Sequence, residues 1–141
     1  MTNDADLDCP FCSIVAGAAA WRVDEDRATV SFLDLGQATA GHTLVVPRRH
    51  APDLWALTED EAATVMRAVH RVARLLRDAL RPDGMNIVQS NGAAAWQEVA
   101  HFHIHVVPRY DGDELVAPWR STGVAPPAQL AGVLRRITGD Q

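Results

Sequence analysis

The sequence predicts an α+β domain with an antiparallel sheet of about five strands, one long amphipathic helix and short terminal helices. Several short runs rich in β-branched and aromatic residues are typical of strands. One long segment repeats apolar residues at three- and four-residue steps, which indicates a helix with one buried face. Short, hairpin-like connections favour antiparallel pairing. The 141 residues are expected to form a single domain, with an acidic tail at residues 1–8 and a C-terminal tail at residues 111–141.

Local residue patterns justify each expected element. In PFCSIVAG, Pro10 suits the first turn of a short helix and Gly17 suits its end. Thr58 and Glu61 form a capping-box pattern at the start of the long helix, and RPDG ends it near residue 81. The apolar face of this helix is expected to hold Ala62, Val65, Met66, Val69, Val72, Ala73, Leu76 and Leu80. Strands are expected over residues 28–34, 42–47, 85–90 and 99–107, and a last helix over residues 127–137.

Composition narrows the class of function. A net charge of -5 argues against general nucleic-acid binding, which needs a basic face. No apolar run approaches the roughly 20 residues that span a bilayer, so no membrane association is expected. The start, MTNDADLD, is polar and acidic and does not resemble a signal peptide. Two cysteines spaced C-x-x-C then indicate a reducing compartment, by default the cytoplasm, and favour metal or redox chemistry over a structural disulfide.

The segment HFHIHVVPR places three of the six histidines of the chain at every second position. On a strand, His101, His103 and His105 would share one face, while the alternate apolar residues would face the long helix. The outer two backbones would then lie about 13 to 14 Å apart, which opposes one metal ion bound by all three. The row instead favours nucleophilic and acid/base chemistry, with a neutral nucleophile beside a protonated partner. Three solvated histidines on an exposed face are the alternative.

The same segment also resembles a known signature. HFHIHVV fits the pattern of the histidine triad (HIT) superfamily of nucleotide hydrolases and transferases. CPFCSIVAG, FLDLGQATAGHTLVVPRRH and SNG…WQEV occur in the order typical of that family, and the resemblance extends to about Tyr110. The chain is most similar to the small, bacterial-type members, so the resemblance implies the same antiparallel α+β fold.

The resemblance implies a role for each histidine. His103 would attack the α-phosphorus of a nucleotide derivative, and water would hydrolyse the resulting nucleotidyl-histidine. His105 would bind the phosphate oxygens, the backbone carbonyl of His101 would fix the tautomer of His103, and His42 would support the triad. For His42, a polar residue at the start of a strand is the alternative. This chemistry needs no metal.

The nucleotide pocket implied by the resemblance involves six further residues. Asp34 would bind the ribose hydroxyls, because a carboxylate accepts from two adjacent OH donors. The base would be held by Phe11, Ile14 and Leu35, which otherwise read as core residues. Asn91 and Gln97 would contact the scissile phosphate and the leaving group, although a turn role with the following glycine competes for Asn91.

The C-x-x-C pair is interpreted separately. In several relatives such a pair joins two histidines in a structural zinc site, which implies Cys9, Cys12, His50 and His101 as ligands here. Four such ligands form a closed tetrahedral set. A glutaredoxin-like redox motif is disfavoured, because it should follow a buried strand and CPFC follows an acidic tail.

The resemblance implies a hydrolase that releases a nucleoside monophosphate (AMP-type) from a purine nucleoside phosphoramidate or related adduct. The alternatives are a dinucleoside polyphosphate hydrolase, a phosphorylase or nucleotidyl transferase, and a zinc-stabilised nucleotide-binding interaction protein with weak catalysis. A homodimer is expected, since relatives join their sheets across a two-fold axis. Departures from the family pattern occur at Gln37, Ala38, Trp96 and Glu98; strict alternation predicts that Glu98 faces away from the histidines. Trp119 either reaches a partner's site or anchors the tail.

Overall fold

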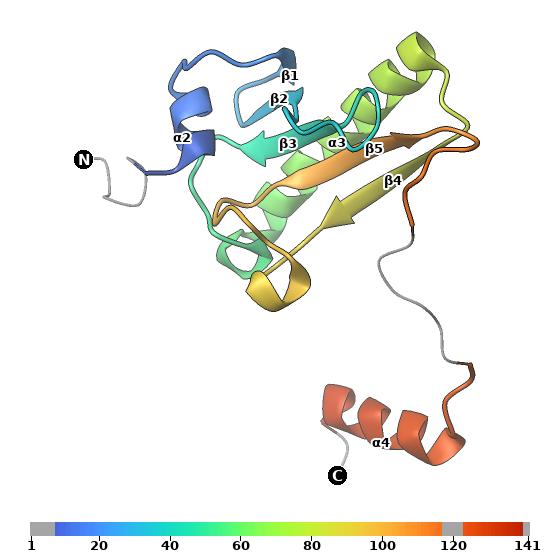
Figure 1. Cartoon of the computed structure of the whole chain (residues 1–141). Helices are drawn as coiled ribbons and strands as arrows, with labels where there is room; N and C mark the ends of the chain where they lie inside the picture. Colours follow the sequence, from blue (N-terminus) through green and yellow to red (C-terminus); the bar gives the residue numbers. More distant parts are fainter. Residues whose placement is uncertain (1–7, 117–122, 140–141) are drawn as a thin grey trace.

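The computed structural model describes residues 8–116 and 123–139, in which a five-stranded antiparallel sheet carries one long helix on one face (Figure 1). The elements follow in the order α2 (Pro10–Val15), β1 (Arg22–Glu25), β2 (Thr29–Leu33), β3 (Thr43–Pro47), α3 (Glu59–Leu80), β4 (Gly84–Gln89), β5 (Ile104–Arg109) and α4 (Pro127–Thr138). Two short 3-10 turns, η1 (Leu54–Ala56) and η2 (Ala93–Ala95), lie in the connections. The strand order is β1-β2-β3-β5-β4, so the predicted α+β fold is confirmed.

The strand β5 brings the histidine segment into the interior of the sheet, between β3 and β4, although the predicted start of this strand was wrong. It pairs with β3 through Leu44 and His105, and with β4 through Ile87 and Val106. The regular strand begins at Ile104, not at residue 99, and the preceding residues form an irregular lead-in. Side-chain alternation still holds at Phe102, which packs in the core with Ile104 and Val106, but it does not extend back to residue 98.

The strand β1 was not predicted, because three of its four residues are charged and no apolar alternation marks it. Tertiary contacts stabilise it instead. It pairs antiparallel with β2. Arg71 on α3 donates to Asp24 at 3.2 Å, and Arg48 after β3 donates to Glu25 at 2.9 Å. Both arginines come from distant parts of the chain, so these partners are not visible in the local sequence.

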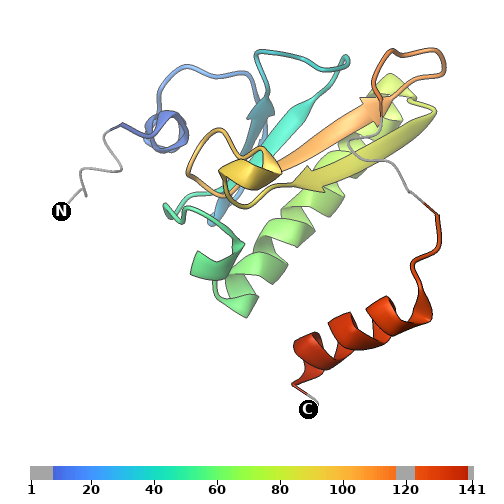
Figure 2. The ribbon, with the colours of Figure 1, turned by 60° about the horizontal axis from the view of Figure 1, so that its bottom comes forward.

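The helix α3 begins as the sequence predicts and packs its apolar face against the sheet (Figure 2). Thr58 and Glu61 form the expected capping box. The core between helix and sheet contains Val45, Val65, Ala68, Val69, Val72, Leu76, Phe102, Ile104 and Val106. Two residues predicted on the buried face are exposed: Met66 keeps 51% of its surface accessible and Leu80 41%. The real buried stripe is narrower and runs through Ala68, as expected when one helix covers a twisted sheet.

The opposite face of the sheet is covered at one end by α2. In β3, Val45 faces α3, while Leu44 and Val46 face the other way and pack with Phe11 of α2. This alternation is the normal consequence of the two-residue period of a strand. The sheet face that α2 does not cover is left open beside β5, which is where His103 and His105 lie.

The C-terminal helix α4 extends from Pro127 to Thr138, close to the predicted range, and lies away from the sheet in both views (Figures 1 and 2). None of its residues is buried. Trp119 lies outside the described residues, so its predicted roles are untested. Within the described ranges, no helix has the length and apolar character needed to cross a membrane.

Candidate active site

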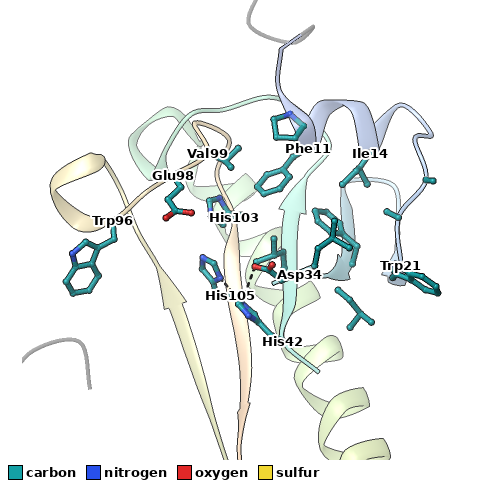
Figure 3. Close-up of a pocket in the computed structure, with 17 residues that line it drawn as sticks. Phe11, Ile14, Trp21, Asp34, His42, Trp96, Glu98, Val99, His103 and His105 are labelled. Carbon is teal, nitrogen blue, oxygen red and sulfur yellow. Dashed lines mark hydrogen bonds and ion pairs between the residues drawn. The ribbon is translucent and has the colours of Figure 1, made fainter. Parts of the chain in front are cut away.

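A pocket of about 990 Å³ opens on the sheet face beside β5 (Figure 3). Its walls come from α2, the loop after β2, the start of β3, the segment 96–99 after η2, and β5. Predicted site residues among those lining it are Phe11, Ile14, Asp34, Leu35, His42, His103 and His105. A cavity of this size suits a ligand as large as a nucleotide. Residues that are scattered over the sequence are thus brought to one place by the antiparallel pairing of β2, β3 and β5.

The three histidines of the triad do not share one environment. His101 is fully buried and does not line the pocket, whereas His103 and His105 line it with ring centroids 4.9 Å apart. The intervening Phe102 and Ile104 pack against α3, as predicted. The rings of His101 and His103 both pack against Phe11, at 5.9 and 5.1 Å between centroids, so they lie on the same side as the sequence predicts. The difference is that His101 is covered, and only His103 and His105 reach the pocket.

The hydrogen bonding of His103 leaves one ring nitrogen with an available lone pair. Its Nδ1 lies 2.7 Å from the backbone carbonyl oxygen of His101. A carbonyl can only accept, so Nδ1 carries the proton and the lone pair is on Nε2. The ring of Phe11 packs edge-on against His103 at 5.1 Å between centroids and limits its rotation. The main chain therefore selects the tautomer that attack on an electrophile requires.

A second chain of hydrogen bonds orients His105. The backbone N–H of Ala38 donates to Nδ1 of His42 at 3.1 Å, so His42 carries its proton on Nε2 when neutral. Nε2 of His42 lies 2.9 Å from Nδ1 of His105, which must accept. The remaining proton of a neutral His105 is then on Nε2. This places an N–H donor beside the lone pair of His103 in the same pocket.

The electrostatic surroundings keep these two supporting rings neutral. Burial lowers the pKa of His42, against the opposing effect of Asp34. Burial, together with His103 and His42, lowers the pKa of His105 to about 4. The sequence-based expectation of a protonated partner beside the nucleophile is therefore not supported for His105 in the free protein. At neutral pH the ring of His105 can offer a hydrogen bond but carries no full charge.

The nucleotide-binding residues expected on the β2 side are gathered there. Asp34 follows β2 directly, and one carboxylate oxygen accepts from the backbone N–H of Gly36 at 2.7 Å. The other oxygen lies 3.6 Å from Nε2 of His42, so Asp34 is in ion-pair range of the histidine that contacts His105 (Figure 3). Phe11 and Ile14 form an apolar wall nearby, and Leu35 is exposed at the rim.

Asn91 and Gln97 do not line the pocket. Asn91 accepts from the backbone N–H of Leu54 at 2.8 Å and exchanges two hydrogen bonds with Gln89. Gln97 accepts from Gly92 and donates to the carbonyls of Pro52 and Val99. Both side chains secure the loop after β4, and their predicted contacts with phosphate and leaving group remain predictions.

Glu98 lines the pocket together with Trp96, and this corrects the prediction from strand alternation. The segment at residue 98 is not part of β5, so the face of its side chain is set by the η2 loop. Sequence reasoning also missed Trp21 and Val99 among the lining residues. Trp21 immediately precedes β1 and follows the Ala18–Ala20 run, and the only local signal for it was a large aromatic residue among small ones.

Cys9, Cys12, His50 and His101 form a compact cluster behind the pocket, as predicted. Their ligand atoms all lie within 4.8 Å of one another. The sulfur–nitrogen separations are 3.4 Å for Cys9–His101, 3.2 Å for Cys12–His50 and 3.5 Å for Cys12–His101, and the two Nδ1 atoms of His50 and His101 lie 3.1 Å apart. A tetrahedral zinc ion with ordinary bond lengths requires about 3.6 Å between sulfur and nitrogen and about 3.4 Å between two nitrogens.

The tautomer of His101 also fits a metal ligand. Its Nε2 lies 2.8 Å from the carbonyl oxygen of Pro47, so the proton is on Nε2 and the lone pair on Nδ1. Nδ1 is the atom that faces the two sulfurs and His50. A carbonyl that accepts from the second nitrogen is a typical outer partner of a metal-bound histidine. The donor set and its spacing thus fit a closed zinc site.

Comparisons with known proteins agree with this geometry. The HIT domain model matches residues 18–112. A HIT family member from Bacillus subtilis has a crystal structure with a TM-score of 0.87 and 36% identity, covering 95% of this chain and 97% of that one. A zinc-bound histidine triad family protein from Mycobacterium smegmatis is 40% identical, with a TM-score of 0.74 over 94% of this chain and 93% of that one.

A curated relative carries an enzymatic name. The adenosine 5'-monophosphoramidase hnt1 of Schizosaccharomyces pombe is 31% identical over 122 residues, which cover 85% of this chain and 89% of that protein. The match of the family model, the shared fold and the arrangement of His101, His103 and His105 lead to one conclusion. The chain belongs to the histidine triad (HIT) domain family.

Proposed function

We propose that this protein is a hydrolase that releases a nucleoside monophosphate from purine nucleoside phosphoramidates through a nucleotidyl-His103 intermediate. The observation that carries the proposal is the pair formed by His103 and His105. The first directs a lone pair on Nε2, and the second directs an N–H donor, within one pocket. The name of the fission yeast relative, an adenosine 5'-monophosphoramidase, supports the same reaction class.

The reaction divides into two steps. Nε2 of His103 attacks the phosphorus atom, and the P–N bond of the substrate breaks. The electron pair of that bond stays with the amine nitrogen, which takes a proton from solvent and leaves as the free amine. Water then attacks the phosphorus and gives a proton back to solvent, the P–N bond to His103 breaks with its electron pair returning to Nε2, and the nucleoside monophosphate is released.

The surrounding residues assist at defined atoms. The N–H on Nε2 of His105 donates to a phosphate oxygen and stabilises the charge that builds up there in the transition state. The carbonyl of His101 accepts from Nδ1 of His103 and stabilises the positive charge on the ring once Nε2 is bonded to phosphorus. The carboxylate of Asp34 accepts from the ribose hydroxyls, and Phe11 and Ile14 cover the base.

We infer that Cys9, Cys12, His50 and His101 hold a structural zinc ion. Bound zinc would cross-link α2, the segment after β3 and the segment before β5, and it supplies no step of the reaction. His101 would then serve two sites, since its ring binds the metal and its carbonyl orients the nucleophile. The zinc-bound relative from Mycobacterium smegmatis supports this assignment.

We also infer a homodimer in the cytoplasm. Strand β4 lies at the edge of the sheet, where Ile87 and Val88 expose 45% and 38% of their surfaces. An edge strand with unpaired backbone groups and apolar side chains is a typical site for pairing with a second chain. The reduced Cys9 and Cys12 required by the zinc site support a reducing compartment.

The test is a comparison of the wild type with His103→Asn on AMP-morpholidate and on diadenosine polyphosphates. We expect the wild type to release AMP from the phosphoramidate and the variant to lose almost all of this activity, because it has no nucleophile. Equal, slow release by both proteins would refute the proposal and favour the interaction-protein alternative. Faster turnover of the polyphosphates would favour the dinucleoside polyphosphate alternative. Nucleoside diphosphate formed in the presence of inorganic phosphate would indicate a phosphorylase.

A further inference from the structure

The side of the pocket formed by Trp96 and Glu98 has no role in the reaction described above. In Figure 3, His103 and His105 lie in the middle, with Asp34 and His42 on one side and Glu98 and Trp96 on the other. The base and ribose are assigned to the first side. The amine that leaves from phosphorus would therefore lie on the other side, beside Glu98 and Trp96, which we call the Glu98 side.

The carboxylate of Glu98 is available to a ligand. It lines the pocket, is exposed, and has no hydrogen-bond or ion-pair partner among residues 8–116 and 123–139. The acidic residues that stabilise the fold, such as Asp24 and Glu61, are instead paired with arginines. A positive group placed beside Glu98 would gain an ion pair without breaking one in the protein.

The charges around the pocket favour a cation on this side. The lining residues with permanent charge are Asp34 and Glu98, and no arginine or lysine lines the pocket. His42 and His105 are neutral at neutral pH for the reasons given above. A polyphosphate leaving group would bring several negative charges to a wall that offers a carboxylate and no cation.

Trp96 adds an aromatic surface to the same wall. It keeps 62% of its surface exposed, and its backbone is left-handed with a φ of 70°, which is uncommon for a bulky residue. The two residues beyond it on the chain are Gln97, which secures the loop, and Glu98. Ammonium and guanidinium groups bind favourably to indole faces. An exposed indole two residues from a free carboxylate is thus suited to a positively charged organic group.

We propose that Glu98 and Trp96 form a leaving-group subsite that selects amines carrying a second, positively charged group. This inference rests on the proposed function and narrows its substrate class to purine nucleoside 5'-phosphoramidates of cationic amines. It also predicts that diadenosine polyphosphates are poorer substrates than these phosphoramidates. Glu98 acts in this role as a specificity-determining residue, while bond breaking depends on His103.

The experiment compares kcat/KM for three substrates in the wild type and in Glu98→Gln. The substrates are the adenosine 5'-phosphoramidates of 1,5-diaminopentane and of pentylamine, and diadenosine tetraphosphate, in low salt without added divalent cations. We expect the wild type to favour the cationic over the neutral amine by roughly two- to fivefold, as for one partly exposed ion pair, with most of the effect in KM. In Glu98→Gln the ratio falls towards one, and activity on the tetraphosphate rises roughly twofold or more. High salt reduces the preference of the wild type in the same way.

Two further variants complete the design. Glu59→Gln removes the same charge from an exposed position at the start of α3, outside the pocket, and should leave all ratios unchanged. Trp96→Leu keeps the carboxylate and should lower the preference for the cationic amine by roughly twofold relative to the wild type. Equal amine ratios in the wild type and Glu98→Gln, with both amines hydrolysed through His103, would overturn the subsite and leave the proposed function intact. If no phosphoramidate is hydrolysed faster than by His103→Asn, the proposed function fails, and this inference fails with it.

Discussion

The lowered pKa of His105 makes the stability of the domain depend on pH. Burial, with His103 and His42 nearby, lowers this pKa from 6.5 to about 4 in the folded protein. The unfolded chain restores the value of about 6.5, so between these pH values the unfolded state binds more protons than the folded state. The stability that a neutral His105 contributes is therefore complete above about pH 6.5 and is lost as the pH falls towards 4.

The size of the effect follows from the same values. A pKa that differs between 6.5 and about 4 corresponds to about 3 kcal/mol if the ring were fully shielded from water. Because His105 is only partly buried at the pocket wall, solvent screening reduces the expected contribution to about 1–2 kcal/mol. His105→Asn removes the titrating ring and should remove this part of the pH dependence.

The assay is urea unfolding of wild type and His105→Asn at pH values between about 4.5 and 7.5, with a chelator in all samples. The chelator prevents metal loss at low pH from contributing to the difference. The free energy of unfolding of the wild type should fall by about 1–2 kcal/mol more than that of the variant over this range. His70→Asn, which removes an exposed imidazole from α3, controls for loss of an imidazole as such. Parallel pH profiles for wild type and His105→Asn would refute the reasoning.

Three further predictions follow from other parts of the structure. Cys12→Ser should abolish stoichiometric zinc binding and lower the melting temperature by about 10 °C or more, as expected when the lost ion has a dissociation constant about a thousandfold below its free concentration. Elemental analysis and calorimetry test this, and a wild type without zinc would contradict it. Arg81 ends α3 with a φ of 51°, so Arg81→Gly should raise the melting temperature by about 3 °C while Arg81→Ala does not; an unchanged value for the glycine variant would show that the left-handed backbone is not strained. Ile87→Asp on the edge strand β4 should convert the expected homodimer into monomers in analytical ultracentrifugation, and a wild type that is already monomeric would refute the dimer.

Local sequence patterns were sufficient where an element is stabilised by its own residues. The capping box of Thr58 and Glu61 fixed the start of α3, because both partners lie within one turn. The short helix α2 and the β-branched strands β2 and β3 followed in the same way. The pairing of His103 and His105 on the pocket face was also predicted, since two residues at a spacing of two share a face of an extended chain.

Long-range contacts decided what the local patterns did not contain. Strand β1 depends on Arg48 and Arg71, which come from other elements. The orientation of Glu98 depends on where β5 begins, and this is set by pairing with β3 and β4. For this reason alternation assigned Glu98 to the wrong face, and the proposed leaving-group subsite emerged only from the folded chain.

The sequence by itself determined the family resemblance, the long helix and the residue types available for catalysis and zinc binding. Only the tertiary structure decided the protonation of His42, His101 and His105, because folding places the partner groups that select it. The N–H of Ala38 acts on His42 and the carbonyl of Pro47 acts on His101. A histidine presents either nitrogen as donor or acceptor until such a partner is fixed. Folding therefore gives three similar histidines the different environments that the proposed metal ligand, nucleophile and hydrogen-bond donor require.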